Sequence, residues 1–284
     1  MTFMIPKLPL AHSIDVMLDW LTTHISFITK AFSHGISVLI DGMVHGLLWL
    51  PPWLLIAAVA LLAWRAAGWR VALGSLVGLL LLWNLRLWSA TVETFTLVLI
   101  STLIAVAVGL PLGIAAALSK RTARVVMPIL DFMQTMPAFV YLIPAIPFFG
   151  LGAVSASVAT VIFATPPTIR LTVLGIRQVP KDLIEAADAF GSTRRQKLFK
   201  VQLPMAVPTI MAGVNQTVML SLSMVVIAAM IGAGGLGGEV WRAIQRLEPG
   251  KGFEAGIAIV ILAMILDRIT QRIGRDPSAR ESGQ

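Results

Sequence analysis

The sequence contains no cysteine, and charged residues make up only 13% of its 284 residues. The absence of cysteine excludes disulfides and thiolate metal sites, and it leaves the redox compartment undetermined. About a quarter of the residues of a soluble domain are charged, so a chain that is 57% hydrophobic is predicted to be an integral membrane protein. Its unit of organisation is therefore the membrane span of ~20 apolar residues.

Catalytic and metal-binding patterns are also missing. The nucleotide-binding pattern G-x-x-x-x-G-K-[ST] does not occur. Residues 232–237 fit G-x-G-x-x-G, but they follow a membrane span instead of a strand, so we interpret them as a tight extracytoplasmic turn. All four histidines precede the first confident span, where they offer neither a hydrolase base at membrane depth nor a convergent zinc site: His12, His24, His34 and His45. We expect no catalytic residue, no metal and no cofactor on this chain.

What the chain does contain is a series of long apolar segments. Seven spans are predicted, with a short helix near 125–135 between the third and fourth: 47–64, 71–88, 93–118, 137–153, 155–177, 209–232 and 253–271. Five prolines interrupt the fourth and fifth spans and predict bent or broken helices near a cavity: Pro137, Pro144, Pro147, Pro166 and Pro167. The predicted fold class is an all-α polytopic membrane protein.

The first 46 residues differ from the rest. Between about Ser13 and Met43, apolar residues recur every three or four positions, as on one stripe of a helix. Three polar residues make this segment a poor span: Lys30, His34 and Asp41. We predict an extracytoplasmic or interfacial amphipathic segment, formed by two helices that meet near Gly35. A short spanning helix is the alternative.

Basic residues are distributed unevenly between the two sides of this topology. Fifteen lie on the side that carries residues 180–204, six lie on the other side, and Arg170 is left at a predicted membrane boundary. Because basic residues favour the cytoplasmic side, seven spans predict an N-terminus outside the cell and a C-terminus in the cytoplasm. Membrane topology therefore explains the net charge of +8 better than a nucleic-acid partner does. The predicted location is the bacterial inner membrane.

Residues 180–204 form a polar, basic island between very apolar segments. Pro180 suits the first turn of a helix, and Gly191 suits its end. Thr193 and Gln196 are a capping-box signature that begins a second helix, which Pro204 should prevent from continuing. One face of the first helix carries apolar side chains that can insert into a partner's groove: Leu183, Ile184, Ala187 and Phe190. We predict a cytoplasmic docking element.

Several of these residues carry a family resemblance. Glu185, Ala186, Ala187, Gly191, Leu203 and Pro204 resemble the EAA loop of permease subunits from binding-protein-dependent ABC importers. Residues 134–142, 166–171, 211–217 and 266–268 resemble the glycine betaine, proline betaine and choline branch of that family. The resemblance covers roughly residues 90 to 275.

The resemblance implies an organisation and a function. Residues 91–272 would form the permease core with its coupling loop at 180–204, residues 47–90 two accessory transmembrane helices, and residues 273–284 a cytoplasmic tail. The chain would be a homodimeric permease, not an enzyme, that imports choline or a betaine delivered by an extracytoplasmic binding protein. ATP and Mg²⁺ would be bound by cytoplasmic ATPase subunits. The alternative is an ATP-independent secondary transporter or channel, which would need its own coupling-ion site.

Polar side chains within the spans are candidates for the translocation pathway. Asp131 and Gln134 lie one helical turn apart and are candidates to face that pathway. The alternative, which we favour for Asp131, is a structural ion pair with Arg124. Tyr141 offers a π face to a quaternary ammonium ion, although ordinary packing is the better explanation. The span 209–232 carries further polar side chains that line a pore or form hydrogen bonds between helices, two interpretations of equal weight: Asn215, Thr217, Ser221 and Ser223.

Overall fold

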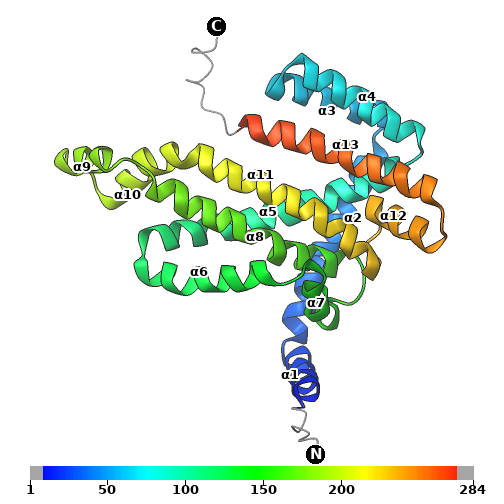
Figure 1. Ribbon diagram of the computed structural model, residues 1–284, viewed down its shortest axis with the longest axis horizontal. Helices are drawn as coiled ribbons and strands as arrows, with labels where there is room; N and C mark the ends of the chain where they lie inside the picture. The colour runs from blue at the N-terminus through cyan, green and yellow to red at the C-terminus, as the bar shows by residue number, and fades with distance from the viewer. Residues whose placement is uncertain (1–8, 274–284) are drawn as a thin grey trace, which may run out of the picture.

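The computed structural model describes residues 9–273, which are almost entirely helical and contain no strand (Figure 1). The helices are α1 (Leu10–His24), α2 (Ser26–Trp49), α3 (Pro52–Ala67), α4 (Trp69–Asn84), α5 (Trp88–Leu118), α6 (Lys120–Thr135), α7 (Leu142–Phe149), α8 (Ala153–Arg177), α9 (Lys181–Ala189), α10 (Arg194–Lys197), α11 (Leu203–Ala228), α12 (Gly235–Gln245) and α13 (Pro249–Ile273). Short 3-10 turns cover Ala138–Tyr141 and Ala229–Ile231, and a π-helical turn covers Leu198–Gln202. The predicted all-α class is confirmed.

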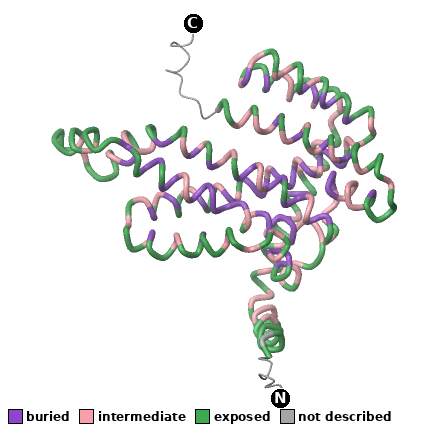
Figure 2. The backbone as a smooth tube through the Cα atoms, in the orientation of Figure 1, coloured by how far each residue is buried: buried purple, intermediate pink, exposed green. Residues whose placement is uncertain are grey.

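The centre of the molecule is formed by α5, α8 and α11, which run side by side in Figure 1. Small residues let their backbones approach closely, as is common between membrane helices. A Cβ atom on Gly113 of α5 would lie 2.6 Å from Cβ of Thr172 on α8, and one on Gly213 of α11 would lie 3.0 Å from Cβ of Leu171. Figure 2 shows buried residues concentrated along these helices.

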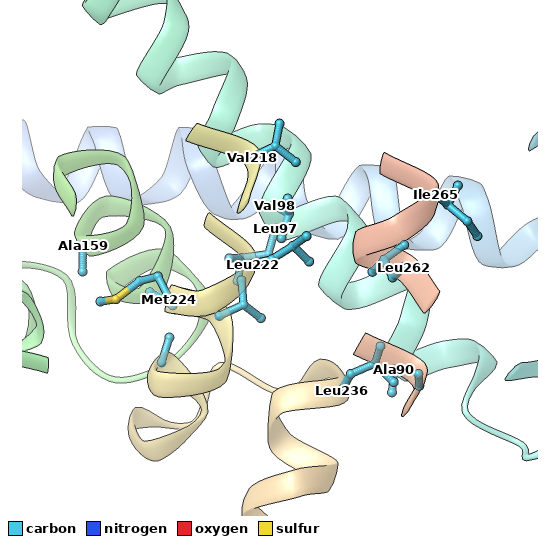
Figure 3. Packing of buried hydrophobic residues seen from close by; sticks show 14 of the residues in the cluster. Ala90, Leu97, Val98, Ala159, Val218, Leu222, Met224, Leu236, Leu262 and Ile265 are labelled. Carbon is cyan, nitrogen blue, oxygen red and sulfur yellow. The ribbon is translucent and has the colours of Figure 1, made fainter. Parts of the chain in front are cut away.

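Apolar side chains fill the end of this core that lies nearest α12. Figure 3 shows Leu97 and Val98 of α5 beside Leu222 of α11, with Leu236 of α12 and Leu262 of α13 completing the cluster. All five are at most 4% exposed. Helices from both halves of the chain therefore share one core.

Four described helical stretches are long and apolar enough to cross a membrane: α2, α5, α8 and the continuous stretch Arg194–Ile231. The predicted spans 93–118 and 155–177 lie within α5 and α8, and the predicted span 209–232 extends one residue beyond the stretch Arg194–Ile231. The predicted span 253–271 lies within α13, which has 25 residues. The predicted spans 47–64 and 71–88 correspond to α3 and α4, of 16 residues each. A 16-residue helix is about 24 Å long, shorter than the ~30 Å hydrocarbon core. The total of seven spans stays a prediction.

The predicted fourth span is not one continuous helix. The chain bends by 113° between α6 and the helical segment 138–149, so the two form a broken span or a re-entrant loop. The break at Pro137 agrees with the expectation of a broken helix near these prolines. The fifth span is not broken at Pro166 and Pro167, because α8 continues through both, and a bend there stays a prediction. Close packing of α5 and α11 on α8 holds that helix together.

The N-terminal segment forms two helices, as predicted, but they meet at Ile25 and not near Gly35. Gly35 lies inside α2, whose Ile36 and Ile40 are buried in a cluster with Ile100 of α5. These contacts anchor α2 to the core, and the helix continues through the glycine. Figure 1 shows α2 crossing the direction of α8 and α11 instead of running beside them. Both the interfacial and the spanning interpretations of this segment stay predictions.

Candidate coupling element and polar contacts

A small helical element projects from one end of the bundle (Figure 1). It consists of α9 and α10, and α9 has no buried residue. Pro180 directly precedes α9, with φ −53°, and Asp182 supplies a negative charge in the first turn, where the helix dipole favours it. This element is helical because of its local sequence, since it buries almost no apolar surface.

Gly191 ends α9 as the sequence predicts. Its φ of +73° is the left-handed conformation that glycine adopts without a Cβ penalty. The amide of Ser192 donates to the carbonyl of Ala187 at 2.9 Å, and the amide of Gly191 donates to that of Asp188 at 2.9 Å. These two bonds form a Schellman motif, so the turn satisfies carbonyl groups at the end of α9.

The predicted capping box is confirmed. The hydroxyl of Thr193 accepts from the amide of Gln196 at 3.3 Å, and the Gln196 side chain accepts from the amide of Thr193 at 2.8 Å. Lys197 of α10 then donates to the carboxylate of Asp188 of α9, with an Nζ–Oδ2 distance of 2.7 Å. This ion pair joins the two helices across the glycine turn, which fixes the shape of the element.

The prediction that Pro204 ends the second helix is wrong. The chain continues from α10 through the π-helical turn into α11, where Pro204 occupies the first turn. A proline is tolerated there because the first-turn N–H groups of a helix have no partner within it. Leu203 and Pro204 therefore lie in a continuous helical connection between the projecting element and α11.

The projecting element leaves apolar surface open. Phe190 is 91% exposed and Leu183 is 42% exposed, whereas Ile184 and Ala187 are half-buried. Glu185 and Ala186 are exposed, and Glu185 forms no hydrogen bond or ion pair with any residue of the range 9–273. Apolar and charged groups that contribute nothing to the fold are therefore available to a partner.

Asp131 does not pair with Arg124, contrary to the pairing that we favoured. Its carboxylate forms an ion pair with the guanidinium group of Arg170, which lies on α8 opposite α6. The Asp131 side chain is 67% exposed and the Arg170 side chain 37% exposed. An unassigned arginine at a predicted membrane boundary was the only signal for this partner. Gln134, one turn further along α6, is also exposed.

Most of the other pathway candidates contact neighbouring helices. The hydroxyl of Thr217 lies 2.8 Å from that of Thr168 and donates to the carbonyl of Ala164 at 2.9 Å. Ser221 is buried and accepts from the hydroxyl of Thr102 at 3.3 Å. These contacts match the hydrogen bonding between helices that we weighed equally with pore lining.

Three further candidates occupy different environments. Tyr141 is buried, and its hydroxyl donates to the carbonyl of Met133. Ser223 is exposed and donates to its own helix at Met219. The side-chain amide of Asn215 donates to the carboxylate of Asp267 at 2.9 Å. Asn215 therefore joins α11 to α13 through the carboxylate of Asp267.

The glycine-rich turn before α12 contains a contact that sequence reasoning missed. The carboxylate of Glu93 on α5 accepts from the amide of Gly235 at 2.8 Å, and the hydroxyl of Thr94 accepts from the amide of Leu236 at 2.8 Å. Gly235 has φ +64°, and a Cβ atom there would lie 2.5 Å from the Thr94 hydroxyl. A nucleotide-binding turn would hold the phosphates of a ligand at its helix N-terminus, whereas this turn holds the carboxylate of Glu93 from the same chain.

Among the described residues, no group of three or more histidine, aspartate or glutamate side chains is arranged to hold a metal ion. Together, the helical bundle, the polar contacts between its helices and the projecting element define a polytopic membrane-transport component. The chain belongs to the family of binding-protein-dependent transport system inner membrane components, whose model matches residues 109–277.

Similar proteins support this assignment. The chain is 54% identical over 269 residues to the glycine betaine transport system permease protein OpuAB of Bacillus subtilis, covering 95% of both chains. It is 53% identical over 279 residues to the glycine betaine/carnitine transport permease protein GbuB of Listeria monocytogenes, covering 95% of this chain and 97% of that protein. The fold is similar to that of the MetNI methionine ABC transporter in an inward-facing conformation, with a TM-score of 0.60, 24% identity, and coverage of 64% of this chain and 91% of that chain.

The chain is therefore an inner-membrane, multi-pass permease subunit of an ABC importer. The expectation from the resemblance is confirmed at this level. These findings do not support the alternative of an ATP-independent secondary transporter or channel, because both the family and the similar permeases point to an ABC importer.

Proposed function

We propose that this permease carries a betaine, with glycine betaine as the first candidate, into the cell. The two similar permeases described above both have glycine betaine in their names. A quaternary ammonium ion cannot donate hydrogen bonds, so a pathway recognises it through shape, π faces and diffuse potential. The contacts of Thr217 and Ser221 within the core leave few polar groups for a tight site. We infer that a separate extracytoplasmic binding protein supplies most of the selectivity.

The observation that carries the proposed coupling to an ATPase is the exposed apolar surface of α9 on an otherwise polar projection. Burying a Phe side chain contributes about 1.5–3 kcal/mol, and Phe190 is 91% exposed. We infer that a cytoplasmic ATPase subunit covers Phe190, Leu183 and the Glu185-Ala186-Ala187 segment. ATP and Mg²⁺ would bind to that subunit alone. Closure of two such subunits would move α10 and, through the π-helical turn, α11.

We further propose that two copies of the chain enclose the pathway. The Asp131–Arg170 pair lies on an exposed surface of α6 and α8. Charged groups are costly in contact with lipid, so this surface is better suited to water or to a second copy. The apolar side chains Val125 and Ile129 of α6 are 63% and 53% exposed and offer contact area to that copy. We also propose, from the distribution of basic residues, that the N-terminus lies outside the cell and the C-terminus lies in the cytoplasm.

The ATPase activity of the reconstituted importer tests the coupling role of α9. Phe190→Ala should lower binding-protein-stimulated ATPase activity at least tenfold, because it removes the most exposed aromatic group of the element. Leu247→Ala is the matched control, since Leu247 is 87% exposed in the turn between α12 and α13, at the opposite end of the bundle. Equal stimulated activity in the Phe190 variant and wild type would refute the docking role.

A further inference from the structure

We propose that the groove between α4 and α13 binds an anionic phospholipid from the cytoplasmic leaflet, an assignment of leaflet that rests on the orientation proposed above. The two helices touch at Gly78, where a Cβ atom would lie 2.6 Å from Cγ2 of Ile261. Towards the cytoplasmic ends they diverge and leave a cavity of about 210 Å³. A Cβ atom on Gly74, one turn earlier in α4, would meet nothing within 4 Å.

A buried hydroxyl lines this cavity. Ser75 of α4 is 2% exposed, and its Oγ has no hydrogen-bond partner among residues 9–273. An unsatisfied buried polar group costs about 1–3 kcal/mol. A phosphate or ester oxygen of a lipid would accept a hydrogen bond from Ser75, whereas an acyl chain alone would leave the hydroxyl unsatisfied. The lining therefore favours a ligand with oxygen atoms at this depth.

One basic residue lies at the cytoplasmic rim of the cavity. Arg268 of α13 lines the cavity, is exposed, and forms no hydrogen bond or ion pair within the described part of the chain. Arg70 of α4 does not line the cavity, and its guanidinium group stacks over Trp69 at 5.6 Å near the same end of α4. Tryptophan and arginine at the end of a span are typical of the membrane interface. Basic pockets between helices on the cytoplasmic side are suited to anionic headgroups.

A second, apolar groove beside this cavity would hold the acyl chains of the lipid. Ile261 and Met264 line both this cavity and a second, apolar groove of about 670 Å³ that runs along α12 and α13 as far as Phe253. An acyl chain in the second groove would cover Met264 and Phe253, which are 54% and 76% exposed. Headgroup charge, glycerol oxygens and hydrocarbon would then meet Arg268, Ser75 and the apolar groove in that order.

Native mass spectrometry of the purified chain with added lipid tests the proposal without any transport assay. Wild type should retain phosphatidylglycerol, and it should retain neither phosphatidylethanolamine to the same extent nor glycerol phosphate, which lacks acyl chains. Gly74→Leu, which fills the cavity, and Arg268→Gln, which removes the charge, should each reduce phosphatidylglycerol occupancy at least fivefold. Equal retention of the two lipids, or unchanged occupancy in Arg268→Gln, would overturn the assignment.

Matched controls and a photo-crosslink complete the test. Gly46→Leu of α2, which also meets open space, and Arg65→Gln of α3, which does not line the groove, should both retain lipid as wild type does. A benzophenone amino acid at position 74 should give an adduct to phospholipid. An adduct to a second copy of the chain, or to residues 274–284, would identify a different occupant and contradict the proposal.

Discussion

Replacing Gly191 by leucine should uncouple transport while leaving the protein folded in the membrane. The residue has φ +73°, and a Cβ atom there meets nothing within 4 Å, so the cost comes from the backbone conformation and not from a clash. That cost is about 1–2 kcal/mol for a residue with a Cβ atom. Because α9 has no buried residue, the cost is borne by the local turn and not by the core. It corresponds to a roughly 5–30-fold loss of the docked conformation.

The assay is ATPase activity and uptake by the importer in proteoliposomes, together with thermal unfolding of the permease. Gly191→Leu should lower both activities about 5–30-fold with an unchanged unfolding midpoint. Gly191→Asn should retain most activity, since asparagine tolerates the left-handed region. Gly232→Leu is the control for backbone strain away from α9. Gly232 has φ +84°, a Cβ atom there would also meet nothing within 4 Å, and the residue lies at the opposite end of the bundle. The reasoning fails if Gly191→Leu transports like wild type, or if the Asn and Leu variants are equally impaired.

Three further predictions concern topology, the charged pair and the glycine turn. In this cysteine-free chain, Ala189→Cys should react with impermeant thiol reagents only from the cytoplasm and Gln245→Cys only from outside; reversed labelling would contradict the proposed orientation. Asp131→Asn should lower the transport rate without changing the preference among choline, betaines and neutral solutes, because only its arginine partner is affected; competition uptake with an unaltered binding protein would reveal a switch. Gly235→Ala should destabilise the protein by more than ~2 kcal/mol in thermal unfolding, since its Cβ would lie 2.5 Å from a hydroxyl of α5, whereas Gly238→Ala, which meets nothing within 4 Å, should not; equal stability of the two variants would show that the turn tolerates a side chain.

Features set by local sequence were predictable. The end of α9 at Gly191 and the capping box of Thr193 and Gln196 each follow from one turn of chain, and the structure contains both. The same holds for the break at Pro137. In each case the residue type restricts the backbone directly.

Features set by packing were not predictable. Asp131 selects Arg170 over Arg124 because α6 lies against α8, a contact between residues 39 positions apart in sequence. Pro166 and Pro167 fail to interrupt α8 because neighbouring helices hold it on both sides. Gly235 provides the space for a hydroxyl of α5, so its role depends on a residue 141 positions away. Such contacts leave no periodic pattern in the sequence.

The central claim is that this chain transports a betaine only as part of an ATP-driven assembly. The most direct measurement is uptake of radiolabelled glycine betaine into proteoliposomes that contain the permease, its ATPase subunits and enclosed Mg-ATP, with the binding protein outside. The account predicts uptake that requires the ATPase subunits, hydrolysable ATP and the binding protein together. Uptake by the permease alone, driven by an ion gradient without ATP, would contradict it.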